Sequence, residues 1–454
     1  MTQEQTPPKT EAELKPHNGP SILFASPMSI LDITSGASLS MRTFLAALAE
    51  RGFRAVALQA TLFDSTHGGE HVLEAGEQAK GKDILRTQAL GIEHIIVRTK
   101  ASRRPDMTCE EQERYIKCFR LELRDRRPDM IILWGGMLLE MNIMREAREL
   151  GIPVIFYLVN SGYNFKDTFR YVSAIITDSQ STADMYRERH NLLCHPIGKF
   201  IDTKLIKAPE RKPDYITFIN PSFEKGVNVF MPLAKLAAEE CPEIKFLVVQ
   251  SRGRWDVALK TLKFNATDFP NVSIIGHQRD MRKVYANTRA LLLPSVWYES
   301  GARVIPEALL NGIPVVASNT GGSKELVGKA GVLFDLPEDV REKKLIPATV
   351  EVVRPWLEEI KRLWHDADYY QALCAQVDEE AKKHDIQRSV DRFLAIADPI
   401  VQDSKIAVQK VLEAKKKAAA GATVPQSTAA KDVIKAALNR KQAQQKSRNK
   451  KKAK

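Results

Sequence analysis

The sequence predicts an α/β protein with two domains, each a parallel sheet covered by helices on both faces. Short, continuously apolar runs alternate with longer stretches in which apolar residues recur at helical spacing. This alternation occurs twice, before and after a polar, proline-containing segment at 207–214. Strands that are apolar throughout are typical of sheets buried on both faces. We therefore expect two Rossmann-like, doubly wound domains that face one another, followed by a C-terminal helical segment and a basic, flexible tail.

The length and composition agree with this architecture. A chain of 454 residues is long enough for two or three domains of ordinary size. Its hydrophobic content of 44% and charged content of 27% are usual for globular proteins and argue against a chain that is disordered throughout.

The strands of the two series follow one another in order along the chain. Helical spacing occurs between them, for example at 40–51 and 138–150. The first series of expected strands comprises 21–28, 54–60, 93–99, 129–136, 153–160 and 174–179, and the second comprises 215–220, 245–251, 272–276, 290–295, 314–318 and 331–335.

These patterns divide the chain into five parts. The polar start and the Lys- and Ala-rich end contain little that could form a core. We expect a disordered segment at 1–19, a first domain at 20–206, a second domain at 207–384, a helix at 385–400 that packs back on the first domain, and a basic tail at 401–454.

Several classes of protein are disfavoured by the sequence. The five cysteines lie far apart with no Cys-x-x-Cys pair, which argues against a disulfide scaffold or a thiolate zinc site and favours a reducing compartment. The first 20 residues contain no apolar segment typical of a secretory signal, and the longest apolar runs are too short to span a bilayer. We therefore expect a cytoplasmic protein.

The net charge of +12 comes from the tail. Residues 401–454 contain 15 Lys and Arg but only three acidic residues, so the first 400 residues are electrically balanced. Such a tail is typical of a solvated extension. It could also contact an anionic membrane at the inner face of the cell. Nucleic acid is a weaker alternative because the tail has no aromatic side chain on which bases could stack.

The segment 293–327 contains the most informative motif. A strand is followed by a loop with Glu299 and by a helix expected to start near Arg303 or Val304, with Glu307 in its early turns. Carboxylates at such a position can accept hydrogen bonds from sugar or ribose hydroxyls. The backbone N–H groups of Gly301, Ala302 and Arg303 are suited to phosphate.

This segment resembles the nucleotide-binding signature of family-4 retaining glycosyltransferases of the GT-B fold. That signature has two Glu separated by seven residues, which Glu299 and Glu307 match. It continues with a Gly-x-Pro-Val strand entry, matched at 312–315, and a Gly-Gly-x-x-Glu helix start, matched at 321–325. Several ordered elements within 35 residues make this resemblance specific.

Shorter matches extend the resemblance over most of 20–395. Lys225-Gly226 resembles the element in which a lysine meets the donor diphosphate, and a lysine is a mobile point charge suited to phosphate. The turn that contains His277 resembles the one that contacts the nucleobase, and residues 197–202 resemble the junction between the domains. Gly36 resembles the glycine of the acceptor-side loop in the first domain.

Two positions depart from the family pattern. Asn220 stands where the family usually has an arginine, and we expect Arg252 or Arg254 to supply the missing charge. Trp134 stands at about the place of a histidine that faces the donor sugar, and is either a packing residue or a platform under a sugar ring.

Each match also has a simpler explanation. Glu307 could be a solvated helix-start glutamate, Glu299 a plain loop carboxylate, and Lys225 a residue of an exposed helix start. Gly36 and His277 could be ordinary loop residues. The spacing His67-x-x-Glu70-His71 formally matches a zinc-peptidase motif, but its two consecutive glycines favour a loop over a helix.

The resemblance implies transfer of a sugar from a nucleoside-diphosphate sugar to an unidentified glycan, lipid or other acceptor, with retention of anomeric configuration. It implies no cofactor and no metal ion. Lys225 and Glu299 would be catalytic, with Glu299 holding sugar hydroxyls and Glu307 the ribose. The donor-binding residues would be Glu307, Gly301, Ala302, Arg303, Val304, Arg252, Asn220, His277 and Gly36. The alternatives are a nonenzymatic binding protein on a degenerate glycosyltransferase body, and another nucleotide-sugar enzyme such as an epimerase.

Overall fold

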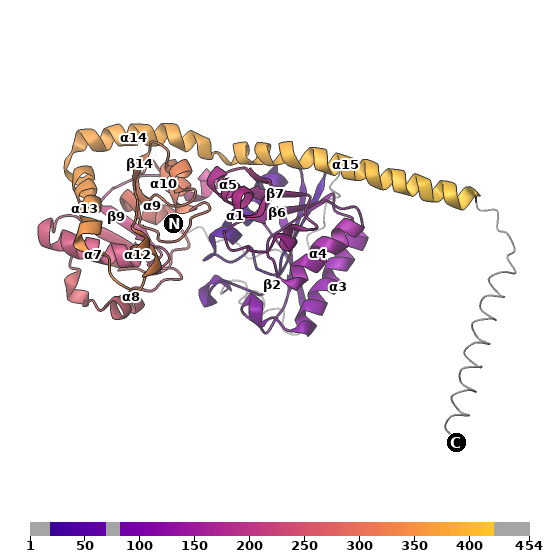
Figure 1. Ribbon diagram of the computed structural model, residues 1–454, viewed down its shortest axis with the longest axis horizontal. Coiled ribbons are helices and arrows are strands. Elements are labelled where there is room, and N and C mark those ends of the chain that lie inside the picture. Colours follow the sequence, from indigo (N-terminus) through magenta and orange to yellow (C-terminus); the bar gives the residue numbers. More distant parts are fainter. Residues whose placement is uncertain (1–18, 70–81, 422–454) are drawn as a thin grey trace, which may run out of the picture. The chain divides into compact units, whose positions relative to one another are not determined.

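The structure is a computed structural model that describes residues 19–69 and 82–421. Contacts divide the chain into a large unit that ends at Ser404 and a second unit that starts at Lys405. The large unit contains two separate sheets (Figure 1). The predicted fold class, two Rossmann-like α/β domains followed by a helical segment, is confirmed.

The first sheet has eight strands in the order β3-β4-β2-β1-β5-β6-β7-β8. Its central strands pair in parallel, as expected from their apolar sequences. The strands are β1 (Ser21–Ala25), β2 (Arg54–Ala60), β3 (Ile84–Ala89), β4 (Ile92–Val97), β5 (Met130–Leu133), β6 (Val154–Leu158), β7 (Ala174–Thr177) and β8 (Cys194–Pro196).

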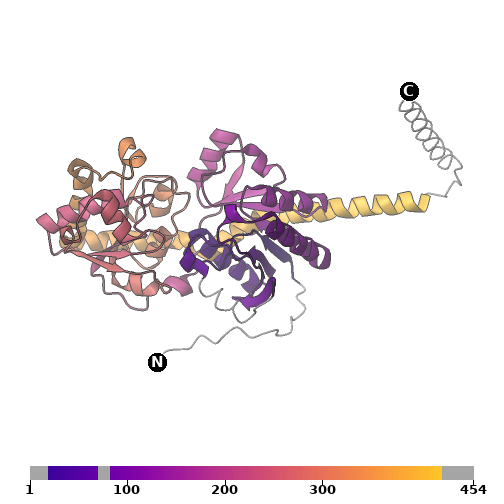
Figure 2. The same cartoon turned by 90° about the horizontal axis from the view of Figure 1, so that it is seen from below.

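Helices cover both faces of this sheet (Figures 1 and 2). Alternate residues of one strand point to opposite faces, so Leu23 packs in a core with α3 and α4 while Phe24 packs in another with α1. The helical elements of this part are α1 (Gly36–Glu50), η1 (Thr66–Gly69), η2 (Arg104–Asp106), α3 (Cys109–Arg126), α4 (Leu138–Glu149), η3 (Lys166–Phe169), α5 (Gln180–His190) and α6 (Thr203–Ile206).

The edge strand β3, which the apolar pattern did not predict, pairs antiparallel with β4. Leu90 and Gly91 join the two strands, and both have positive φ angles, of 55° and 72°. A two-residue connection of this kind forms a tight hairpin, whereas parallel strands need a long crossover. The strands predicted from the apolar pattern pair in parallel, and β3, which the pattern did not predict, is the exception at this edge.

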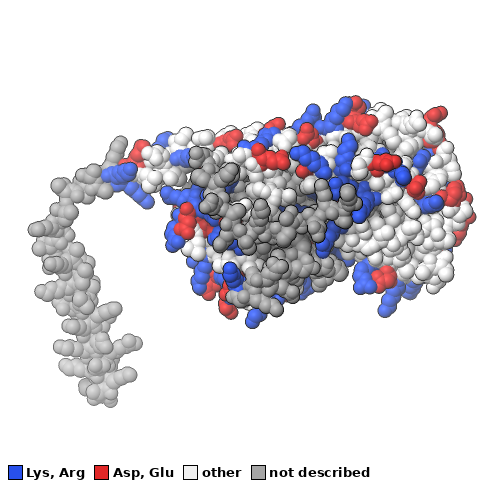
Figure 3. All heavy atoms as spheres, turned by 180° about the vertical axis from the view of Figure 1, so that it is seen from behind, with Lys and Arg blue, Asp and Glu red and all other residues white. Residues whose placement is uncertain are grey.

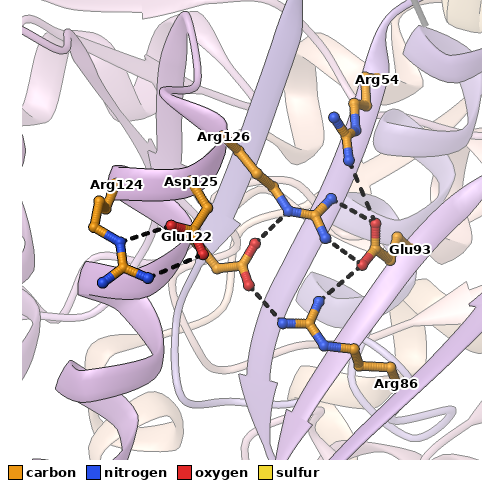
Figure 4. A network of polar contacts seen from close by, with 7 residues as sticks. All are labelled: Arg54, Arg86, Glu93, Glu122, Arg124, Asp125 and Arg126. Carbon is orange, nitrogen blue, oxygen red and sulfur yellow. Dashed lines mark hydrogen bonds and ion pairs between the residues drawn. The ribbon is translucent and has the colours of Figure 1, made fainter. Parts of the chain in front are cut away.

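Ion pairs fasten the hairpin to α3 (Figure 4). Arg86 of β3 bonds Glu93 of β4 at 3.0 Å and Glu122 of α3 at 2.8 Å. Arg126 contacts the same two carboxylates, each at 2.6 Å. Two guanidinium groups thus share two carboxylates, one half-buried and one buried. This pairing offsets the free energy that burying unpaired charges beside the sheet would cost.

The second sheet has six strands, all parallel, in the order β11-β10-β9-β12-β13-β14. The predicted second series of apolar runs matches these strands to within about two residues at each end, as expected for boundaries. They are β9 (Tyr215–Ile219), β10 (Phe246–Val249), β11 (Val272–Ile275), β12 (Thr288–Leu293), β13 (Val315–Ser318) and β14 (Gly331–Phe334).

This sheet also has a core on each face. Phe218 and Leu292 pack with helices α7, α8 and α13, whereas Leu291 and Leu293 pack with α10, α11 and α14. The helical elements are α7 (Val227–Glu240), α8 (Trp255–Leu262), η4 (Ala266–Asp268), α9 (Arg282–Asn287), α10 (Val304–Leu310), α11 (Ser323–Val327), α12 (Glu338–Glu342), α13 (Val350–His365), α14 (Ala367–Ala381) and η5 (Lys382–His384).

Helix α15 (Ile386–Gly421) begins on the first domain and continues into the basic segment. Val390, Phe393 and Ala397 are buried in the core that contains α1. The helix extends past Ser404, where the large unit ends, to Gly421. No helix among the described residues is long and apolar enough to cross a membrane.

Charged side chains of both signs are interspersed over the face shown in Figure 3. This distribution agrees with the balance of charges in the first 400 residues. Because the net charge over these 400 residues is zero, a functional site in the two sheets depends on local charges and not on the net charge of the domains.

Candidate functional site

The predicted site residues gather at the carboxyl ends of four neighbouring strands. In the second sheet, β10, β9, β12 and β13 lie side by side and run in the same direction. The loops that leave them contain Arg252, Lys225, Glu299 and Gly321 respectively. Ligands of open α/β sheets bind outside this edge, so the topology brings together residues that lie up to 100 positions apart.

Lys225 and Glu299 form an ion pair at the centre of this edge. Lys225 Nζ donates to Glu299 Oε1 over 2.6 Å, and Ser295 Oγ donates to the same oxygen over 2.6 Å. The carboxylate side chain is only 7% exposed, whereas the lysine is 23% exposed. The lysine ammonium can therefore still reach a ligand from solvent, while its partner carboxylate is held in place.

Backbone contacts fix the loop after β12 against the loop after β9. The carbonyl of Glu224 accepts hydrogen bonds from Val296 N at 3.1 Å and from Ser295 Oγ at 3.0 Å. Gly226 has a φ angle of 82°, and an added Cβ would lie 1.8 Å from the carbonyl oxygen of Pro294. Only glycine fits this close approach, which sets the position of Lys225 beside Glu299.

The Gly-Gly turn after β13 packs on the other side of Glu299. Gly322 N donates to the Glu299 carbonyl over 2.7 Å, and a Cβ on Gly321 would lie 2.2 Å from that oxygen. The glycines of the motif therefore serve to bring two loops together. The next helix, α11, starts at Ser323 directly after them.

Glu307 lies on α10, which starts at Val304 as predicted, but its carboxylate is already occupied by protein groups. Tyr285 donates to Oε2 over 2.6 Å and Arg303 Nε to Oε1 over 2.5 Å. Burial, and then the Glu307 charge, raise the pKa of Tyr285 well above its usual range, so its hydroxyl remains a donor. Both carboxylate oxygens of Glu307 therefore have protein partners, so the side chain is not the solvated glutamate of the simpler explanation.

Arg303 links this carboxylate to the first domain. Its Nη1 donates to the carbonyl of Phe200 over 2.8 Å and to Ser40 Oγ over 3.3 Å. The sequence predicts a role for the backbone N–H of Arg303 but not for its side chain. Nothing in the local sequence indicates this contact, because Ser40 lies 263 positions away.

A buried ion pair faces the same loop from the first domain. Lys199 Nζ donates to Asp178 Oδ2 over 2.6 Å, and Tyr157 donates to Oδ1 over 2.5 Å. A Cβ on Gly301 would lie 2.5 Å from the Asp178 Cβ, so the glycine allows the loop to approach this cluster. Sequence reasoning missed Asp178; its position directly after a buried strand was the available signal.

Asn220 connects the loop after β9 to the loop after β10. It has a φ angle of 65°, and its Oδ1 accepts a hydrogen bond from Gly253 N over 2.7 Å. The neighbouring Arg252 is half-exposed and lies 3.6 Å from Asp64 of the first domain. Arg254 instead pairs with Asp256, two residues further along the chain, which leaves Arg252 as the better candidate for a ligand charge.

The remaining predicted residues occupy less informative positions. Ala302 is buried and Val304 is partly buried at the start of α10, a helix of seven residues. His277 is half-buried after β11. Gly36 starts α1, and an added Cβ there would meet no atom within 4 Å, so its side-chain position is open.

Two further predictions concern residues outside this edge. Trp134 is buried and its ring lies 4.8 Å from that of Phe24, so it is a packing residue and not a platform. His67 lies in η1, whereas Glu70 and His71 lie outside the described residues. Within the described ranges, no group of three or more His, Cys, Asp or Glu side chains is arranged to hold a metal ion.

Several solved structures share this two-domain fold. A glycosyltransferase from Rickettsia africae has a TM-score of 0.61 and 12% identity, over 85% of this chain and 99% of its own. HepE of Anabaena, solved with UDP and glucose, has a TM-score of 0.56 and 17% identity, over 84% and 98%. Sucrose-phosphate synthase of Thermosynechococcus elongatus has a TM-score of 0.55 and 15% identity, over 87% and 100%. At these identities, the similarity is one of fold.

Comparison with curated protein sequences gives no match to this chain. A family model does match part of it, and the matched residues are those of the second sheet. They include Lys225, Glu299 and Glu307, and therefore the centre of the site described above. Residues 214–353 match the family Glycosyl transferases group 1.

Proposed function

We propose that the protein transfers a glycosyl group from a nucleoside-diphosphate sugar to an acceptor, with retention of anomeric configuration. The observation that carries this proposal is the Lys225–Glu299 pair at the adjoining ends of β9 and β12. It joins a partly exposed cation to a fixed carboxylate, within the residues that match Glycosyl transferases group 1. A diphosphate leaving group and a sugar hydroxyl need these two kinds of group side by side.

The proposed roles follow from the surroundings of each residue. Lys225 stabilises the negative charge that develops on the departing diphosphate, with Arg252 as a second, more exposed cation. Glu299 accepts hydrogen bonds from donor-sugar hydroxyls through Oε2, because Oε1 is taken by Lys225 and Ser295. Glu307 contacts the ribose, and Arg303 and Tyr285 hold it in position.

The structural neighbours support a nucleotide-sugar donor. HepE of Anabaena was solved with UDP-glucose as well as with UDP and glucose, and the fold it shares with this chain includes both sheets. This support concerns the class of donor.

Calorimetry with UDP and GDP tests the proposal directly. We expect the full chain to bind at least one of them, and the corresponding nucleotide sugar to raise the melting temperature, because a ligand that binds only the folded state stabilises it. If neither these nucleotides nor their sugar conjugates bind, the proposal is wrong. Binding without any slow hydrolysis of the sugar conjugate would favour a nonenzymatic binding protein, to which the uncharged Asn220 lends support.

We also propose that the C-terminal segment contacts an anionic membrane surface. In α15, the large apolar side chains Ile406, Val411 and Leu412 are about half-exposed. They alternate with lysines at 405, 410, 415 and 416. Basic residues near an anionic lipid surface contribute about 1 kcal/mol each.

Sedimentation with lipid vesicles tests this second proposal. The full chain should sediment with phosphatidylserine vesicles and not with neutral phosphatidylcholine vesicles, and binding should weaken at high salt. Deletion of 405–454 should abolish sedimentation but preserve nucleotide affinity. Equal sedimentation of the truncated and full chains would contradict the proposed contact between the C-terminal segment and the membrane.

A further inference from the structure

A hollow of about 310 Å³ lies beside the loop that carries Glu299. Val296, Trp297 and Tyr298 of that loop form one wall, and Ser161 contributes from the loop after β6 of the first domain. This volume is at the lower end of the range for small-molecule sites, which is about 300–1,000 Å³. The hollow therefore has room for a small ligand directly next to the candidate site.

Trp297 is the largest aromatic side chain that lines this hollow. Its side chain is 48% exposed, although the backbone is fixed by hydrogen bonds at both ends. Trp297 N donates to the Glu224 carbonyl over 3.2 Å, and the Trp297 carbonyl accepts from Thr320 Oγ1 over 3.1 Å. A large aromatic side chain that is held in place and left half-exposed is typical of a binding surface.

The wall that α12 contributes is polar. Glu338, Arg341 and Glu342 come from α12, which is anchored by the buried Val340 and by a hydrogen bond from Asn228 Nδ2 to the Val340 carbonyl at 3.3 Å. Within the part of the chain that the structure describes, these three charged side chains form no hydrogen bond or ion pair. Their donors and acceptors are therefore available to a ligand.

This combination selects a particular class of ligand. A sugar ring has an apolar C–H face that can stack on an indole, and an edge of hydroxyls that can bond carboxylates and a guanidinium. The charged side chains of the lining sum to −1, which disfavours a phosphate or another anion. A lipid chain would bury three charged groups without partners, at a high cost in free energy.

We propose that this hollow binds a neutral sugar ring of the acceptor, so that the acceptor is a carbohydrate. The inference rests on the proposed glycosyltransferase function and names the acceptor class. Trp297 lies two residues before Glu299, and Tyr298 between them is tied to the first domain by a 3.0 Å contact with Ser181 Oγ. The acceptor ring would therefore lie next to the donor sugar but apart from Lys225.

The experiment measures binding of neutral oligosaccharides to the full chain in the absence of donor. Cello-, malto- and chito-oligosaccharides and lactose are titrated while tryptophan fluorescence and ligand-observed NMR are recorded. We expect at least one to bind, and W297A to bind it about tenfold more weakly, since an aromatic contact of about 1.4 kcal/mol corresponds to that factor. W297F should retain part of the affinity.

Matched variants distinguish a loss of binding in this hollow from effects that any surface substitution could have. F165A removes an aromatic side chain that is 79% exposed but does not line the hollow, and it should leave affinity unchanged. E338Q and E342Q should weaken binding, whereas D339N in the same helix should not, because Asp339 is not part of the lining. An equal loss in D339N, E338Q and E342Q would overturn the assignment of the polar wall.

UDP and GDP titrations distinguish this inference from the proposed function. If the wild type binds nucleotide but none of the oligosaccharides, the carbohydrate site is wrong and the glycosyltransferase proposal stands. If W297A loses nucleotide and oligosaccharide affinity to the same extent, the hollow is part of the donor site. The proposal of a separate acceptor site is then wrong. Nucleotide affinity that is unchanged in W297A, together with weakened oligosaccharide binding, supports the proposal.

Discussion

Substitution of Lys225 by alanine is expected to lower the turnover of a nucleotide sugar by about 10²–10³-fold, because a fixed group that stabilises developing negative charge contributes about 2.7–4 kcal/mol to the transition state. The lysine is 2.6 Å from Glu299 and is the partly exposed cation at the junction of β9 and β12. The donor is the nucleotide sugar that raises the melting temperature most. Its rate of hydrolysis is measured as the release of nucleoside diphosphate.

Two further variants control this experiment. K344A removes a lysine that pairs with Glu224 on the same domain, and should retain activity within about twofold because surface ion pairs contribute little. K225R keeps a positive charge and should restore part of the rate. Because K225A leaves the buried Glu299 without its cation, its melting temperature must be measured alongside. A folded K225A protein with wild-type turnover would remove Lys225 from the mechanism.

Substitutions of Glu307 are expected to affect both stability and nucleotide affinity. E307A leaves the Tyr285 hydroxyl and the Arg303 guanidinium, which are both largely buried, without their shared acceptor. Loss of one partner from a buried ion pair costs about 3–5 kcal/mol of the free energy of unfolding. Urea denaturation should therefore show a large loss, and this variant by itself cannot report on ribose binding.

E307Q and Y285F separate the two effects. E307Q keeps the side-chain volume but removes the charge, and should weaken nucleotide binding about 10- to 100-fold if the carboxylate contacts the ribose hydroxyls. Y285F removes only the hydroxyl donated to Glu307, and should cost about 1–2 kcal/mol of stability with nucleotide affinity within about twofold. If both variants weaken nucleotide binding equally, Glu307 acts through packing and not through the ribose.

Most of the fold could be predicted because its signals are local. Continuous apolar runs identified the strands of the second sheet closely, and the expected start of α10 near Val304 is confirmed. The hairpin that contains β3 was missed because its residues alternate between exposed and half-buried, and the connection consists of only Leu90 and Gly91. Such a short edge strand has no apolar run to reveal it.

The candidate site was predicted in part. The motif predicted that Glu299, Glu307 and the Gly-Gly turn lie close together. Lys225 lies beside Glu299 because the parallel strands β9 and β12 are neighbours and end at the same edge of the sheet. The sequence could not show that Arg303 reaches Ser40 and Phe200, nor that Asp178 faces Gly301. These contacts connect residues more than 100 positions apart, and no local pattern encodes which distant partner a side chain meets.

The sequence by itself determined two α/β domains, a balanced charge over 400 residues, and a set of residues suited to a nucleotide sugar. Only the tertiary structure decided which protein partners each of those residues has. Glu307 is bound by Arg303 and Tyr285, and Trp134 is part of the core, whereas Trp297 remains half-exposed beside an open hollow. The physical reason is that residue type limits the chemistry a side chain can perform, while burial and hydrogen-bond partners depend on how distant segments pack.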